Sequence, residues 1–146
     1  MLELLYILRT APFSGNPWLT IFDDALRQGL SSILKVSMSD EQWIQASLPV
    51  QNGGLGVRSA GLLASSAYLA SAVATLPLKN AILESSCSTT SDLAVSEAVA
   101  IWKILSRAEE PFASGNCFQK VWDNTVTSEI YVDRRVDATT ISARRV

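Results

Sequence analysis

The sequence contains no histidine and only two cysteines among its 146 residues. Without histidine, neither a Ser-His-Asp nor a Cys-His arrangement can be assembled, and no GxSxG elbow is present. Cys87 and Cys117 form no CxxC pair, so the four Cys or His ligands of a structural zinc site are missing. These absences argue against nucleophilic hydrolysis and against a metal site, and no motif indicates a cofactor or a small-molecule ligand.

Charge is also scarce, since charged residues make up 18% of the chain and the net charge is −2. A free-standing nucleic-acid binder normally concentrates Lys and Arg, because it must neutralise phosphates. The one locally basic segment is 133–146, where four arginines stand against two aspartates and leave the rest of the chain at −4. We expect residues 1–132 to form a single helical domain and residues 133–146 to form a basic, frayed tail.

The N-terminus has no signal-peptide pattern, because Glu3 interrupts the apolar start and no cleavage-like site follows. The expected location is therefore intracellular, in the nucleus or the cytoplasm. The longest uncharged run is the twenty residues between Arg58 and Lys79, which is long enough to span a membrane. Its Ala/Ser-rich composition favours a buried helix over a membrane span, so no membrane partner is expected.

Helical signals dominate the remaining sequence. Asn16 and Pro17 are typical of a helix start, and an apolar stripe follows them to about Val36. Gly29 lies on that stripe, which suggests that another helix crosses close to it. Ser39 begins a capping-box pattern that predicts a second helix.

The uncharged segment 59–76 predicts the central helix of the fold, because its small side chains allow neighbours to approach on several sides. A short helix is expected at 78–83, a polar loop at 85–91 and two further helices after it. The fold class is thus predicted to be all-α, a compact bundle of about six helices around the helix at 59–76. The tryptophans fall on apolar stripes, so core packing is favoured over base stacking for all four: Trp18, Trp43, Trp102 and Trp122.

A glycine-rich elbow precedes this central helix and contains Gly53, Gly54 and Gly56. Pro49 ends the preceding helix near Ser47. Glycine permits backbone angles that a β-carbon forbids, so we expect a short irregular or hairpin-like connection at 48–58. The run GGLG has neither the P-loop nor the GxGxxG spacing, which favours a structural turn over an anion site.

The run QASLPVQNGGLGVRSAGLLASSAYLAS carries a family resemblance, together with Leu8-Arg9-Thr10-Ala11-Pro12 and Phe22-Asp23 upstream. It resembles the segment after the polymerase palm in LINE-like (non-LTR) retrotransposon reverse transcriptases. The resemblance covers Leu2 to about Asp123 and is clearest up to Leu76. It implies a thumb-like part at 1–58 and post-thumb helices at 59–132. The given sequence contains no fingers, no palm and no Tyr/Phe-x-Asp-Asp box.

The resemblance implies a non-catalytic fragment that helps to hold an RNA template and a DNA primer in a parent RNA-directed DNA polymerase. Phe22 adjoins Asp23-Asp24 inside a helical pattern, so this pair is not read as the polymerase metal site. The alternative is a helical protein-protein interaction module without a nucleic-acid role, favoured by the acidic balance of 1–132. The residues expected to contact phosphates are Arg9, Lys35, Gly53, Gly54 and Arg58.

Overall fold

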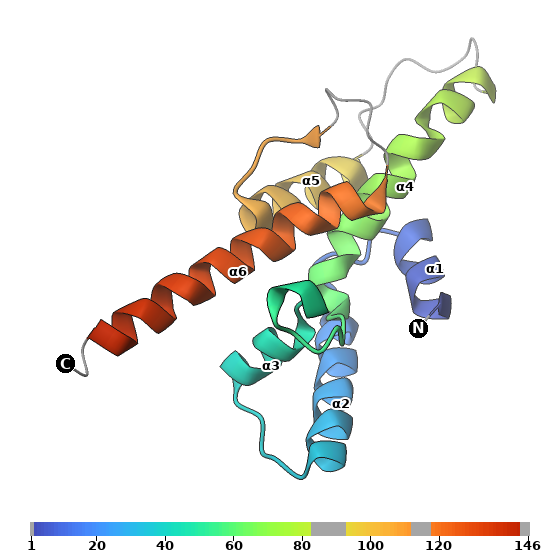
Figure 1. Ribbon diagram of the computed structural model, residues 1–146. Coiled ribbons are helices and arrows are strands. Elements are labelled where there is room, and N and C mark those ends of the chain that lie inside the picture. The colour runs from blue at the N-terminus through green and yellow to red at the C-terminus, as the bar shows by residue number, and fades with distance from the viewer. Residues whose placement is uncertain (1, 83–92, 112–117, 144–146) are drawn as a thin grey trace.

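The computed structural model describes residues 2–82, 93–111 and 118–143. Within these residues it contains six α-helices and no strand, which confirms the predicted all-α class. The polar loop expected at 85–91 lies outside the described residues. The elements in chain order are α1 (Leu2–Thr10), α2 (Pro17–Leu34), α3 (Asp40–Ser47), the 3-10 turn η1 (Val50–Asn52), α4 (Ala60–Ile82), α5 (Leu93–Ser106) and α6 (Gln119–Ala143) (Figure 1).

Local caps begin α2 and α3 as the sequence predicted. The side chain of Asn16 accepts a hydrogen bond from the backbone N–H of Trp18 at 3.0 Å. Ser39 and Gln42 form a complete capping box, because each side chain bonds the backbone N–H of the other. Both devices satisfy first-turn donors that have no partner within the helix.

The start of α4 is capped from two sides. The Ser59 hydroxyl accepts a hydrogen bond from Leu62 N–H at 3.3 Å. The Asp23 carboxylate of α2 accepts from Ala60 N–H at 2.7 Å, from Gly61 N–H at 3.1 Å and from the Ser59 hydroxyl at 2.6 Å. A carboxylate is favourable at a helix N-terminus, so Asp23 binds α2 to the beginning of the central helix.

The central position predicted for this helix is confirmed, because α4 contributes to both hydrophobic clusters of the molecule. One cluster joins its first half to α1 and α2 and contains Leu8, Leu19, Ala60, Leu63, Ala64 and Ala67. The other joins its middle to α5 and α6 and contains Leu69, Ala70, Ala98, Trp102, Trp122 and Val126. Small side chains on α4 let four neighbouring helices approach its axis closely.

The helix is longer than predicted, and the separate short helix expected at 78–83 is wrong. α4 continues through Pro77 to Ile82 without a break. Proline has a φ angle compatible with a helix, so the backbone continues past Pro77 at the cost of the hydrogen bond that its missing N–H would donate to the Val73 carbonyl. The last part of α4 extends beyond the bundle, where Leu78 and Ile82 are exposed (Figure 1).

Among the described helices, α4 alone is long and apolar enough to cross a membrane by length and composition. In its most apolar window 39% of the residues are buried inside the molecule, and buried core helices often meet the same criterion.

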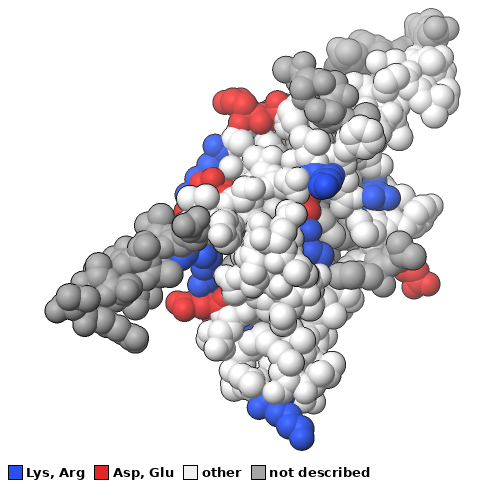
Figure 2. Space-filling model, viewed as in Figure 1, with Lys and Arg blue, Asp and Glu red and all other residues white. Residues whose placement is uncertain are grey.

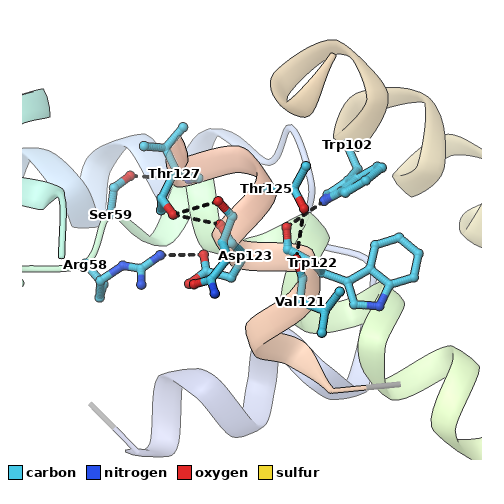
Figure 3. A network of polar contacts seen from close by, with 10 residues as sticks. Arg58, Ser59, Trp102, Val121, Trp122, Asp123, Thr125 and Thr127 are labelled. Carbon is cyan, nitrogen blue, oxygen red and sulfur yellow. Dashed lines mark hydrogen bonds and ion pairs between the residues drawn. The ribbon is translucent and has the colours of Figure 1, made fainter. Parts of the chain in front are cut away.

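Two of the four tryptophans form the centre of the second cluster, as predicted. Trp102 and Trp122 are fully buried, and their rings meet edge to face with centroids 4.9 Å apart. The Trp102 indole N–H donates to the Trp122 carbonyl at 3.1 Å (Figure 3). Trp43 is half-buried. The prediction is wrong for Trp18, whose side chain is 73% exposed.

The reason for this error is that the apolar stripe of α2 is not its packed side. Leu19 is the one buried residue of this helix, and it lies beside Asp23 on a neighbouring side. The helix expected to cross near Gly29 is also absent from the described chain, because a β-carbon at Gly29 would meet nothing within 4 Å. Periodicity predicts which side of a helix is apolar but not which surface covers it.

The last helix extends into the segment assigned to the tail, since the backbone of α6 is helical to Ala143. Arg107, which follows α5, donates to Glu129 and to Asp133 of α6 at 3.0 Å each. These bonds place the beginning of the basic segment beside α5.

Candidate nucleic-acid interface

A cleft of about 420 Å³ opens where the end of α1, the glycine-rich connection and the start of α6 meet. The three segments are far apart in the sequence, and their charged side chains gather at this one place. Figure 2 shows most of one face of the molecule without charged side chains, which are confined to a few places on it. The lining residues are Arg9, Pro49, Gln51, Arg58, Gln119, Lys120, Asp123 and Asn124.

Arg9 stands in the last turn of α1. Its Nε and Nη2 atoms donate to Oε1 of Gln119, the first residue of α6, at 3.0 and 2.6 Å. The guanidinium group remains exposed and has further donors available, because it carries five N–H bonds in all. Gln119 therefore orients Arg9 at the mouth of the cleft without neutralising its charge.

Arg58 is the last cation before α4, and it forms an ion pair with Asp123 of α6 (Figure 3). The side chains are 24% and 12% exposed, so the pair is partly shielded from water. The backbone that carries Asp123 is also held by the Thr127 hydroxyl, which donates to the Asp123 carbonyl at 3.0 Å. Arg58 thus fixes the glycine-rich connection to the first turns of α6.

Lys120 completes the set of cations. Its side chain is exposed and makes no ion pair within the part of the chain that the structure describes. Three cations and one carboxylate give the cleft a charge of +2, in a protein whose net charge is −2. Guanidinium and ammonium groups in this number suit an anionic ligand with several phosphates.

The structure brings together two of the five residues that the sequence assigned to phosphate contacts, Arg9 and Arg58. Lys35 does not reach this cleft, because it caps the far end of α2 with a left-handed backbone at φ 54°. Its N–H closes the helix by donating to the Ser31 carbonyl.

The two glycines of the prediction shape the connection itself. Gly53 ends η1 at φ 74°, and its carbonyl accepts a hydrogen bond from Nε2 of Gln45 at 3.0 Å. A β-carbon on Gly54 would lie 2.0 Å from the Leu48 carbonyl oxygen. This close approach explains why glycine is needed there, and it places Arg58 by folding residues 48–58 against the end of α3.

Sequence reasoning missed the contribution of α6, namely Gln119, Lys120 and Asp123. Lys120 is a single cation at a helix start, and Asp123 stands 65 positions after Arg58. Neither residue belongs to a motif, so no local signal connected them with the elbow. Only the packing of α6 on α4 places them opposite Arg9 and Arg58.

A second hollow, of about 520 Å³, lies beside α2 and carries a balanced charge. Its cation Arg27 is bound to Asp40 and to the Met38 carbonyl. With Asp24 also in its lining, this hollow has no excess positive charge. The cleft at Arg9, Arg58 and Lys120 is therefore the better candidate for an anionic ligand.

Comparison of the chain with protein-family models, with curated proteins and with solved structures yields no match. The resemblance to LINE-like reverse transcriptases therefore stays a hypothesis that rests on the quoted residues.

Proposed function

We propose that this chain is a thumb-like, non-catalytic portion of a LINE-like RNA-directed DNA polymerase, and that its cleft holds the backbone of an RNA template and a DNA primer. The observation that carries the proposal is the convergence of Arg9, Arg58 and Lys120 on one cleft with a charge of +2. All three cations fall within the stretch that resembles the retrotransposon enzymes. The parent protein would be intracellular.

The mechanism is positioning, without bond making or breaking. Arg9 and Lys120 contact phosphate oxygens directly, because both are exposed at the cleft. Arg58 is bound by Asp123, so a phosphate competes with that carboxylate for the same guanidinium group. Polymerisation itself requires two metal ions held by a palm, which this chain does not contain.

The proposal predicts opposite effects for two substitutions in the cleft. Lys120→Gln should weaken the binding of a labelled RNA–DNA primer-template by roughly fivefold, which corresponds to about 1 kcal/mol. Asp123→Asn should strengthen it, because the carboxylate that competes with phosphate for Arg58 is removed. Fluorescence anisotropy at about 50 mM salt measures both effects, since low salt favours phosphate contacts.

The control for net charge is Lys103→Gln, which removes the same charge from an exposed position on α5 outside the cleft, where Lys103 pairs with Glu110 at 2.6 Å. Its affinity should stay within about twofold of the wild type if local contacts rather than net charge decide binding. Lys35→Gln tests the remaining cation of the sequence prediction in the same assay. The proposal is contradicted if the wild type does not bind, or if Lys120→Gln and Lys103→Gln behave alike.

The second candidate function is a helical protein-interaction module. The observation that favours it is the number of large apolar side chains that are more than half exposed among the described residues. If the chain does not bind nucleic acid at low salt, this result would favour the second function over the first. These exposed residues are Tyr6, Trp18, Ile21, Ile33, Val36, Val50, Leu55, Leu78, Ile82, Leu93, Ile104, Phe118 and Val132.

A further inference from the structure

The outer side of α2 is an apolar surface that nothing in the described chain covers. Trp18 is 73% exposed, Ile21 54%, Phe22 38% and Ile33 79%. Ala25 is also exposed, and a β-carbon at Gly29 would meet open space. Large aromatic residues are normally among the most buried residues of a domain, so we expect a binding partner to cover this surface.

These residues form one continuous stripe, because they recur every three or four positions along an 18-residue helix. Most of the stripe is accessible, since α2 is attached to the molecule through Leu19 and Asp23 on a different side. Figure 1 places α2 at the periphery, with its length extending away from α1 and α6. We call the residues 18, 21, 22, 25, 29 and 33 the α2 stripe.

The stripe contains one pair of residues that are complementary in size. The aromatic ring of Phe22 lies in its N-terminal half, and the smallest residue, Gly29, lies in its C-terminal half. If two α2 helices pack antiparallel about a two-fold axis with Trp18 facing Ile33 of the second copy, Phe22 faces Gly29 of that copy. An aromatic ring then enters the gap that a missing side chain leaves, as close helix packing requires.

The exposed area is also sufficient for a weak dimer. The exposed fractions of its four large side chains correspond to roughly 500 Å² of apolar surface per copy. Complete coverage of the stripe in both copies would bury at most about 1,000 Å², which lies in the range of weak, transient interfaces. The interface should therefore be reversible and dependent on protein concentration.

We propose that the α2 stripe binds a second copy of this chain, as an antiparallel, two-fold symmetric helix pair. The inference rests on the second candidate function and names the occupant of one of the exposed apolar surfaces behind it. The cleft at Arg9, Arg58 and Lys120 contains no residue of α2, so the two proposals rest on different residues. Nucleic-acid binding and self-association can therefore succeed or fail separately.

The test compares Gly29→Lys with Thr20→Lys in the full chain. The two positions are nine residues apart, or two and a half helical turns, so they lie on opposite sides of α2. Thr20 is exposed as well, which makes it a matched control. Light scattering after size exclusion should show the wild type and Thr20→Lys rising with concentration from 15.8 kDa toward twice that mass. Gly29→Lys should remain monomeric.

A second pair of variants tests the register. Gly29→Phe alone should abolish the dimer, because two phenyl rings would meet. The double variant Phe22→Ala/Gly29→Phe should regain it, because the ring and the gap have exchanged places. The proposal is overturned if the wild type stays monomeric at every concentration, which would leave the stripe to a different protein. It is also overturned if Gly29→Lys dimerises as well as Thr20→Lys.

Discussion

Two adjacent aspartates show how differently one residue type can act in this molecule. Asp23 accepts three hydrogen bonds from Ser59, Ala60 and Gly61, and so joins α2 to the start of α4. Asp24 is exposed and makes no such contact. The sequence motif Asp-Asp invited comparison with a metal site, whereas the geometry of Asp23 explains the residue by helix capping alone.

This difference gives a prediction for stability. Asp23→Ala should lower the free energy of unfolding by about 2 kcal/mol, because it leaves two backbone donors and one hydroxyl without their acceptor. Asp24→Ala should change it by less than about 0.5 kcal/mol, as expected for an exposed surface residue. Urea unfolding followed by circular dichroism measures both values. Equal losses in the two variants would show that the cap does not stabilise α4.

At the scale of elements, the glycine-rich connection decides where the cleft forms. It folds back on the end of α3, since Leu55 N–H donates to the Ala46 carbonyl at 3.0 Å and Gly56 N–H to the Leu48 carbonyl at 2.9 Å. Arg58 follows this turn closely in the sequence, and its side chain therefore points toward α6. The backbone geometry of residues 48–58 thus decides where the charge of Arg58 lies in the cleft.

Two glycine substitutions should change the stability of the fold in opposite directions. Gly54→Ala should destabilise the fold by more than about 2 kcal/mol, because its β-carbon would overlap the Leu48 carbonyl oxygen and force the connection to move. Gly29→Ala should stabilise it by about 1 kcal/mol, since alanine is the better helix former and the site is open. Thermal unfolding at low protein concentration compares the two. A tolerated Gly54→Ala would contradict the structural role given to this glycine.

Much of the secondary structure could be predicted because its signals are local. The caps at Asn16, Ser39 and Ser59 lie within four residues of the donors that they satisfy, so their patterns are visible in the sequence. The side of α2 that packs was missed, because α2 packs through Leu19 in the first hydrophobic cluster and through the Asp23 contact with the start of α4, and not through its apolar stripe. The end of the central helix predicted at 59–76 was placed too early, because α4 continues through Pro77 to Ile82.

The candidate site was only half predictable. Arg9 and Arg58 stand beside recognisable features, the end of a helix and the glycine elbow. Lys120 and Asp123 come from a helix that no local pattern connects with them. Contacts across such separations depend on how α6 packs against α4, and periodicity alone does not contain that information.

At the scale of the whole molecule, the cleft is where the N-terminal and C-terminal parts of the chain meet. The Arg9–Gln119 bonds and the Arg58–Asp123 pair both cross this boundary, while α4 contributes residues to both hydrophobic clusters. The packing of the helices therefore places three cations around one opening. We propose that this opening is a phosphate-binding surface in a molecule that otherwise carries little charge.

The most direct test is the salt dependence of primer-template binding. Three cations on phosphates predict a slope of about −2 to −3 in a plot of log affinity against log salt concentration, because each contact releases roughly 0.7 to 0.9 counterions. Lys120→Gln should make the slope shallower by about 0.7 to 0.9, while Lys103→Gln should leave it unchanged. A wild-type slope near zero, or the same slope in Lys120→Gln as in the wild type, would contradict the account.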